Sequence, residues 1–241
     1  MSRHVTLRIA TYNIHRGRGM DRRVNILRTT KVISDFGADL IALQEVVGPG
    51  PDGMGQAEEI AAQLGMTPIM APTRLLRGRP FGNAIVGRFP VRKHERYDIS
   101  WRDREERGCQ RVDLDVGPGL LHVYNVHLGT SLLERRYQAT HLARILDAPE
   151  IGEPKIMLGD FNEWVRGPAT RVLTERLDSL DLLTHLKRRR TYPGFLPMLH
   201  LDHIYYRGTV EVVQVELVRT RGAMIASDHL PLIAELKIRF E

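Results

Sequence analysis

Cysteine is nearly absent from this chain of 241 residues, which contains only Cys109. A single cysteine excludes an intramolecular disulfide, and such scarcity is typical of proteins kept in a reducing compartment. We therefore expect a cytoplasmic protein. The residues that follow Cys109, Gln110 to Leu114, have the pattern of a strand, which favours a packed side chain over a nucleophile.

Long apolar runs are also absent, and none approaches the roughly 20 residues that a membrane-spanning helix needs. Strand-like sequence begins directly after Met1 to His4, so we expect neither an integral membrane segment nor a secretory signal. No internal repeat or low-complexity segment divides the chain. Its length suits one domain covering residues 1–241, which we expect to be a monomer.

Negative charge is in deficit: the formal net charge is +6 and the pI is about 9.7. This balance favours an anionic partner such as nucleic acid, an anionic lipid or a phosphorylated small molecule. Much of the excess lies in three basic clusters. They are Arg102-Asp103-Arg104, Arg135-Arg136 and Lys187 to Arg190, the last of which is more typical of a solvated loop than of a specific phosphate site. Aromatic residues make up 6% and do not interleave with the basic runs, which argues against a stacking platform for single strands.

Short apolar runs predict a succession of strands, and two apolar stripes predict helices. The first helical stripe contains Val24, Leu27, Val32 and Ile33 and ends near Gly37; the second extends from Leu132 to Leu146, with Ser131 as a plausible cap. Turn residues predict two hairpins, one joining 110–116 to 120–128 and one joining 202–206 to 210–218. Mixed sheets are therefore expected. The predicted strands lie near residues 5–13, 39–45, 82–89, 110–116, 120–128, 154–160, 202–206, 210–218 and 231–239.

Five of these runs have chemically competent polar residues at one end, and this recurrence is the strongest functional signal in the sequence. Open α/β sheets gather ligand-binding residues at one strand edge, so we expect a single convergent site. For any one run the same residues are also good turn and cap chemistry. The polar residues are Asn13 and His15, Gln44 and Glu45, Asn125 and His127, Asp160 and Asn162, and Asp228 and His229.

Seven ordered motifs resemble those of the endonuclease/exonuclease/phosphatase superfamily, and they cover the chain from Thr11 to Pro231. Further segments, Glu134-Arg135-Arg136 with Gln138 and Thr191-Tyr192-Pro193, resemble a small bacterial branch whose substrates are often unassigned. The resemblance implies an α/β fold, a four-layer sandwich in which two mixed β-sheets pack face to face with helices outside. The motifs are Thr11-Tyr12-Asn13-Ile14-His15, Leu43-Gln44-Glu45-Val46, Gly82-Asn83-Ala84-Ile85, Asn125-Val126-His127-Leu128, Gly159-Asp160-Phe161-Asn162, Leu201-Asp202-His203-Ile204 and Ser227-Asp228-His229-Leu230-Pro231.

A hard divalent cation is the expected cofactor, because phosphoester hydrolysis needs a crowded anionic centre to be neutralised. Glu45 is the best ligand candidate, since a carboxylate that follows four apolar residues is expensive to bury unless it is paired or metal-bound. Asn13 and Asp228 would complete the set with oxygen atoms. Cysteine and histidine spacing suited to zinc is absent, so Mg²⁺ or Mn²⁺ is preferred.

The resemblance implies that Asp202 orients His229, while His127, Asp160 and Asn162 line the opposite wall. Either His229 or Asp160 could take the proton from water, and the sequence leaves this open. Asn83 and Asn125 are candidate substrate contacts. Arg107 is the expected phosphate-facing cation, because a guanidinium can bind phosphate in a bidentate manner. A surface ion pair of Arg107 with Glu105 or Glu106 is an equally good interpretation of the charge pattern.

These residues predict a metal-dependent phosphodiesterase acting on nucleic acid or on a phospholipid headgroup. A phosphomonoesterase for a small phosphorylated metabolite and a non-catalytic nucleic-acid or membrane-binding module are the alternatives. Glu45, Asp160 and His229 are all present, which disfavours the non-catalytic module. The apolar segment Phe195 to Leu199 is the nearest candidate for membrane contact, although it could instead pack internally.

Overall fold

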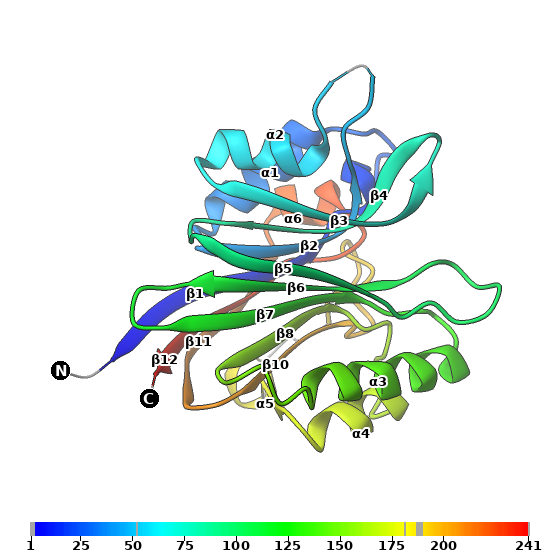
Figure 1. The fold of residues 1–241 in the computed structure, drawn as a ribbon. Coiled ribbons are helices and arrows are strands. Elements are labelled where there is room, and N and C mark those ends of the chain that lie inside the picture. The colour runs from blue at the N-terminus through cyan, green and yellow to red at the C-terminus, as the bar shows by residue number, and fades with distance from the viewer. Residues whose placement is uncertain (1–2, 52, 181, 187–189, 241) are drawn as a thin grey trace.

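A computed structural model describes residues 3–51, 53–180, 182–186 and 190–240. Two six-stranded sheets pack face to face, and helices cover their outer faces (Figure 1). This is the α/β sandwich that the motifs predict. No helix within these ranges is long and apolar enough to cross a membrane.

The first sheet has the strand order β11-β12-β1-β2-β4-β3. Strands β1 and β2 run parallel, and the other neighbours in this sheet are antiparallel. Helices α1, α2 and α6 lie on its outer face (Figure 1). The elements are β1 (His4–Asn13), α1 (Ile26–Asp35), β2 (Leu40–Val47), α2 (Gln56–Leu64), β3 (Thr67–Leu76), β4 (Arg79–Gly87), β11 (Val210–Leu217), α6 (Arg221–Ala226) and β12 (Leu232–Arg239), with the short 3-10 helix η1 (His15–Gly17) after β1.

The second sheet has the order β5-β6-β7-β8-β10-β9, and here β7 and β8 are the parallel pair. Helices α3 and α4 cover its outer face (Figure 1). The elements are β5 (Val91–Asp98), β6 (Gly108–Asp115), β7 (Leu120–His127), α3 (Leu132–Leu146), β8 (Lys155–Asp160), α4 (Pro168–Thr174), β9 (Asp178–Ser179), α5 (Leu182–His185) and β10 (Asp202–Arg207).

Three buried apolar clusters hold the layers together, and strand alternation decides which cluster a residue joins. Ile9 and Val123 point between the sheets, whereas their neighbours Ala10 and Tyr124 point outwards beneath the helices. Because successive side chains alternate, one strand supplies both the central layer and an outer layer. The continuous apolar runs in the sequence follow directly from this double burial.

All nine predicted strands are confirmed, but the edge strands β3, β5 and the two-residue β9 were missed. Strand β3 contains Pro68 and Pro72, and β5 reads as a mostly charged, exposed segment. Edge strands tolerate both features because one side of the strand needs no hydrogen-bonding partner.

The predicted hairpin between 202–206 and 210–218 is wrong, because β10 pairs with β8 and β9 while β11 pairs with β12 in the other sheet. The turn at Arg207 and Gly208 carries the chain from one sheet to the other. The hairpin of β6 and β7 is confirmed.

Both predicted helices form, with differences at their first turns. Val24 lies outside α1, and both Val24 and Leu27 are exposed, so the apolar stripe starts later than predicted. Ser131 precedes α3 as expected, but its side chain makes no capping hydrogen bond. Leu132 and Leu133 are exposed as well, whereas the next two residues of the same turn, Glu134 and Arg135, are buried.

Candidate active site

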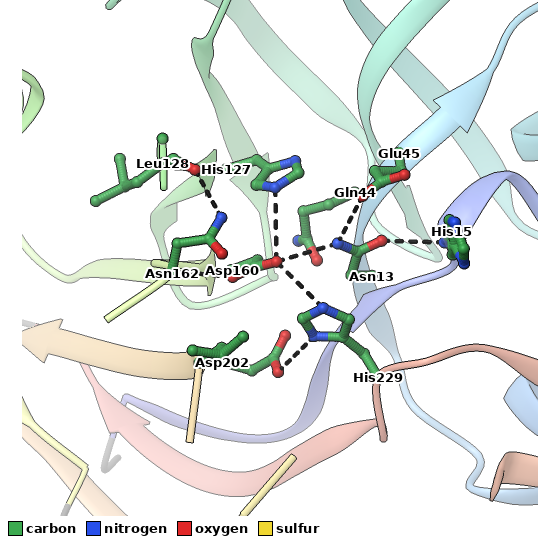
Figure 2. Close-up of polar contacts among 12 residues, drawn as sticks. Asn13, His15, Gln44, Glu45, His127, Leu128, Asp160, Asn162, Asp202 and His229 are labelled. Atoms are coloured by element: carbon green, nitrogen blue, oxygen red, sulfur yellow. Dashed lines mark hydrogen bonds and ion pairs between the residues drawn. The ribbon is translucent and has the colours of Figure 1, made fainter. Parts of the chain in front are cut away.

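Polar side chains from five strand ends meet at one edge of the sandwich, as the recurrence in the sequence predicts (Figure 2). Close approach of β7 and β8 makes this possible. Gly159 has φ 150°, and a Cβ atom there would lie 1.9 Å from the carbonyl oxygen of Val126, so only glycine fits before Asp160.

The carboxylate of Asp160 is the centre of the cluster. Its Oδ2 atom lies 3.1 Å from Asn13 Nδ2 and 3.5 Å from the Nε2 atoms of both His127 and His229. Its Oδ1 atom accepts a hydrogen bond of 2.9 Å from the backbone of Asn162. The carboxylate is buried, and it joins three side chains that come from three different strand ends (Figure 2).

Asp202 and His229 form the pair that the family resemblance implies. Nδ1 of His229 lies 3.0 Å from Oδ2 of Asp202, and both side chains are buried. Thr191 holds the two segments in register: its hydroxyl accepts a hydrogen bond from the backbone of Leu201, and its carbonyl accepts one from Leu230. The ring of Tyr192 lies 5.0 Å from that of His229 and limits its movement.

The charges around His229 determine its protonation. Burial lowers the pKa of His229, but the carboxylates of Asp202 and Asp160 outweigh burial and raise that pKa to about 10. Burial raises the pKa of Asp160 to about 6, against the opposing influence of the His229 charge. In the metal-free protein at neutral pH, His229 is therefore an imidazolium held between two carboxylates.

His127 has the opposite character. Burial, together with the positive charges of Arg107 and His229, holds the pKa of His127 well below its ordinary value. Nη1 of Arg107 lies 3.0 Å from Nδ1 of His127, and Nη2 of Arg107 forms an ion pair of 2.8 Å with Glu105. The ion pair with Glu105 is the alternative that the charge pattern allowed, and it coexists here with the contact to His127.

Of the expected metal ligands, Glu45 and Asp228 present carboxylates at this edge. Asn13 turns its amide nitrogen towards Glu45 and Asp160, and its oxygen accepts a hydrogen bond of 3.0 Å from the backbone of His15. Glu45 adopts a left-handed backbone with φ 56° at an irregularity between β2 and β4, which turns its carboxylate out of the strand. Its Oε1 atom lies 3.3 Å from Asn13 Nδ2. Oδ1 of Asp228 lies 3.4 Å from Nδ1 of His15.

This donor set fits a hard divalent cation. The carboxylates of Glu45 and Asp228 are both part-exposed, and the nearest cation to Glu45 is Arg16, with its Nε atom 3.8 Å away. Two incompletely paired carboxylates are ligand chemistry that Mg²⁺ and Mn²⁺ prefer. A second acidic group, Asp160, Asp202 and His229, is also compact enough to hold an ion, but its imidazole is already paired with both carboxylates.

The sequence model of the Endonuclease/Exonuclease/phosphatase family matches residues 10–229, which include every residue of this cluster. The chain belongs to the endonuclease/exonuclease/phosphatase family. Nucleases and phosphatases both cleave phosphoester bonds, so the coarse chemistry of the site is phosphoester hydrolysis.

Relatives and solved structures agree with this assignment. The Escherichia coli K12 protein YbhP is 30% identical over 250 residues and covers 97% of both chains. A Bacteroides vulgatus endonuclease/exonuclease/phosphatase structure has a TM-score of 0.82 at 18% identity and covers 96% of this chain and 98% of its own. The Bacteroides thetaiotaomicron mannosyl-6-phosphatase structure has a TM-score of 0.77 at 18% identity, with coverage of 95% and 99%. At these identities the solved structures show the shared fold.

Three asparagines differ from their expected positions in this family site. Asn125 points between the sheets and is fully buried; its amide donates to the carbonyls of Leu43 and Ala84, and its oxygen accepts from Gln44. It therefore joins the two sheets rather than contacting substrate. Alternation put Asn125 and His127 on one face, as expected, but Asn125 lies one step deeper in the core.

Asn162 was expected to extend beside Asp160, but its backbone is left-handed, with φ 49°. Its backbone N–H bonds to Asp160, and its side-chain nitrogen donates to the carbonyl of Leu128 (Figure 2). The Gly-Asp-x-Asn segment thus forms a turn, and the same turn places Asp160 in the active site. Asn83 is also buried, and its side-chain nitrogen donates to the carbonyls of Gly108 and Asn125.

The basic clusters and the apolar segment Phe195 to Leu199 differ in their exposure. Arg102 and Arg104 are exposed as expected, whereas Arg135 is buried and paired with Glu163, so Arg135 adds nothing to the basic surface. Phe195, Leu196 and Met198 are exposed and do not pack internally. Lys187, Arg188 and Arg189 lie outside the described residues.

Several residues of the site carried no assigned role in the sequence. His15 and Arg16 approach the carboxylates of Asp228 and Glu45, Thr191 aligns Asp202 with His229, and Glu163 anchors the loop after Asn162. Only proximity to a motif could have suggested them. Their partners are distant in sequence, so no spacing rule reveals the contacts.

Proposed function

We propose that this protein is a divalent-metal-dependent phosphodiesterase acting on nucleic acid or on a phospholipid headgroup. The observation that supports this most directly is the carboxylate of Asp160 between Asn13, His127 and His229, with the carboxylate of Glu45 bonded to the same amide nitrogen of Asn13. The cluster combines a group that can activate water, groups that can neutralise a phosphate and a set of metal ligands.

Glu45, Asn13 and Asp228 would hold Mg²⁺ or Mn²⁺. When bound, the cation would neutralise phosphate charge and polarise the ester. The part-exposed carboxylates of Glu45 and Asp228 support this ligand assignment.

Asp160 is the general base in this proposal, and His229 binds a phosphate oxygen. His229 is flanked by Asp202 and Asp160, and a carboxylate next to each nitrogen favours a proton on both. A fully protonated imidazole donates hydrogen bonds well and cannot accept a proton from water. Asp160 is the remaining candidate, and the backbone N–H of Asn162 holds its second oxygen in place.

His127 and Asn162 complete the wall around the phosphate. Nδ1 of His127 accepts from Arg107, so its Nε2 atom carries the hydrogen that can be donated to a phosphate oxygen. The nitrogen of Asn162 is occupied by Leu128, and its amide oxygen is therefore the atom that can orient a water.

A phosphomonoesterase is the second candidate, and the fold it shares with the mannosyl-6-phosphatase from Bacteroides thetaiotaomicron favours it. Both reactions release an alcohol that needs a proton, so the diesterase proposal rests on the charge of the protein rather than on proton donors. The net charge of +6 suits a polyanion or an anionic headgroup, and binding should then weaken with salt.

One panel tests these alternatives: bis-p-nitrophenyl phosphate, p-nitrophenyl phosphate, plasmid DNA, RNA and phospholipid vesicles, each with Mg²⁺, Mn²⁺ or excess chelator. We expect metal-dependent hydrolysis with kcat/KM higher for the diester. A monoester advantage of about tenfold, equal to about 1.4 kcal/mol, would reject the diester proposal. Binding of DNA or vesicles without hydrolysis of any substrate would favour the non-catalytic module.

A further inference from the structure

A cavity of about 300 Å³ is lined by residues of β3, β4, β5 and β6 and of the loop that joins β5 to β6. Its volume is at the lower end of the range for small-ligand sites, enough for one ring of sugar size. Its lining includes Thr73, Asn83, Tyr97, Asp98, Glu106 and Arg107.

Arg107 connects this cavity to the reacting centre. Its guanidinium lines the cavity and also lies 3.0 Å from Nδ1 of His127, whose other nitrogen faces Asp160. The cavity is therefore separated from the expected phosphate position by little more than one imidazole ring. One phosphoester could therefore place its phosphate next to Asp160 and its alcohol group in the cavity.

A bulge in β3 and one close contact between the hairpins shape the wall of the cavity. The register of β3 against β4 shifts between Pro72 and Arg74, which leaves Thr73 as the extra residue of a bulge. A Cβ atom on Gly108 would lie 2.8 Å from the side chain of Thr73, so the β6 strand approaches this bulge only with glycine at position 108.

Asn83 offers the cavity a hydrogen-bond acceptor. Its side-chain nitrogen is occupied by the carbonyls of Gly108 and Asn125, at 3.2 Å and 3.3 Å, and this fixes the orientation of the amide. The carboxamide oxygen then has no hydrogen-bond partner among the residues that the structure describes, although the residue is only 3% exposed. An acceptor oxygen repels a phosphate oxygen, so the phosphate contact expected for Asn83 does not suit this geometry. The oxygen of Asn83 suits an O–H or N–H group of a ligand.

The rest of the lining has the same preference. Asp98 and Glu106 add carboxylate acceptors, and Arg107 has its Nε atom buried without a hydrogen-bond partner. Tyr97 contributes an aromatic wall. Acceptors for hydroxyl groups, guanidinium donors and one aromatic face together match a hydroxyl-bearing ring with an apolar side.

We infer that this cavity binds the alcohol part of the phosphoester, a sugar ring whose hydroxyl group donates to the oxygen of Asn83. The inference rests on the proposed phosphoester hydrolysis and adds a substrate class to it. The sugar can belong to a nucleotide or to a free sugar phosphate, because both present the same hydroxyl groups to the cavity.

Matched substrates with and without a sugar test the inference. The diester pair is thymidine 5′-p-nitrophenyl phosphate and bis-p-nitrophenyl phosphate; the monoester pair is a hexose 6-phosphate and p-nitrophenyl phosphate. Two variants alter the cavity: Asn83→Ala removes the acceptor, and Glu106→Trp fills the mouth from an exposed position. Glu150→Trp, an exposed position that does not line the cavity, is the control.

We expect kcat/KM for the sugar ester, divided by that for its sugar-free partner, to fall at least tenfold in both cavity variants and to stay unchanged in Glu150→Trp. The pair in which this happens identifies the nucleotide or the free sugar phosphate as the source. An equal loss for both members of a pair, or no change, would overturn the inference while leaving phosphoester hydrolysis intact.

Calorimetric binding separates the two hypotheses if the wild-type protein hydrolyses none of these esters. Thymidine 5′-monophosphate and the hexose 6-phosphate are then titrated into the wild-type protein and into Glu106→Trp. If the wild-type protein binds one of these ligands and Glu106→Trp does not, the sugar subsite is supported even though the proposed function has failed. Equal binding by the two proteins, or none by either, would reject the subsite as well.

Discussion

Arg107 donates to Nδ1 of His127 across 3.0 Å, and this one contact determines the chemical form of the histidine. A guanidinium has donors and no acceptor, so Nδ1 must be unprotonated and the hydrogen must sit on Nε2. His127 therefore faces Asp160 and the phosphate position as a neutral donor. Arg107 acts through His127 as a positioning residue.

Replacing Arg107 should release this constraint. In Arg107→Met we expect imidazole ¹⁵N shifts of His127 to show a mixture of tautomers and a raised pKa, because the guanidinium charge lowers it in the wild type. Turnover should fall by about tenfold or more, as for other partners that orient a functional histidine. Arg107→Lys should restore part of the wild-type spectrum. Unchanged ¹⁵N shifts in Arg107→Met would contradict this role.

Glu45 should dominate metal binding. Glu45→Gln keeps the shape and the bulge but removes the charge, so we expect weaker Mn²⁺ binding by calorimetry and turnover lower by orders of magnitude. Circular dichroism should show an unchanged fold. Glu211→Gln, an exposed position on the edge strand β11, is the matched control. Full activity of the wild type in excess chelator would contradict the metal assignment.

Asp202 and His229 should behave as one unit, because the carboxylate acts only through the imidazole that it holds. Alanine at either position should remove most activity, and the double variant should lose little more than the single ones. Measuring kcat for all four proteins gives the coupling directly. Losses that multiply would show that the two residues act independently.

His229 should also make stability depend on pH. Its pKa is about 10 in the folded protein and near 6.5 when unfolded, so the folded state binds the extra proton more tightly. The stabilisation is fully present below about pH 6.5 and is lost as the pH rises towards 10. Urea unfolding with chelator should show the difference between wild type and His229→Gln shrinking across this window. A constant difference would disprove the linkage.

The buried ion pair of Arg135 and Glu163 should stabilise the two loops that follow His127 and Asn162. Arg135 donates to the carbonyl of Thr130, and Glu163 accepts from the backbone and hydroxyl of Thr170 at the start of α4. Arg135→Met leaves a buried carboxylate unpaired, which should cost about 3–5 kcal/mol in denaturant unfolding. Exposed Arg136 gives a matched control in Arg136→Met, which should change stability little. Similar losses in the two variants would argue against a specific role for the pair.

The sequence was sufficient for the strands that are buried on both faces. Runs such as Leu40 to Leu43 are apolar because alternate residues fill the central and the outer layer, and such runs stand out without any partner being known. The same logic failed for β3 and β5, since an edge strand is defined by the neighbour on one side only. The hairpin error at Arg207 and Gly208 has a similar cause: a turn signal does not say which sheet the next strand joins.

For the site, the sequence by itself was sufficient to predict that Asn13, Glu45, His127, Asp160, Asp202 and His229 come together, because each ends an apolar run or falls in an ordered motif. Tertiary structure alone decided the chemical form and the surroundings of these groups. The tautomer of His127 depends on Arg107, and the charge of His229 depends on two carboxylates from other strands. The burial of Asn125 depends on where the second sheet packs. The protonation and orientation of these side chains come from contacts between residues far apart in the chain, and local sequence patterns do not predict such contacts.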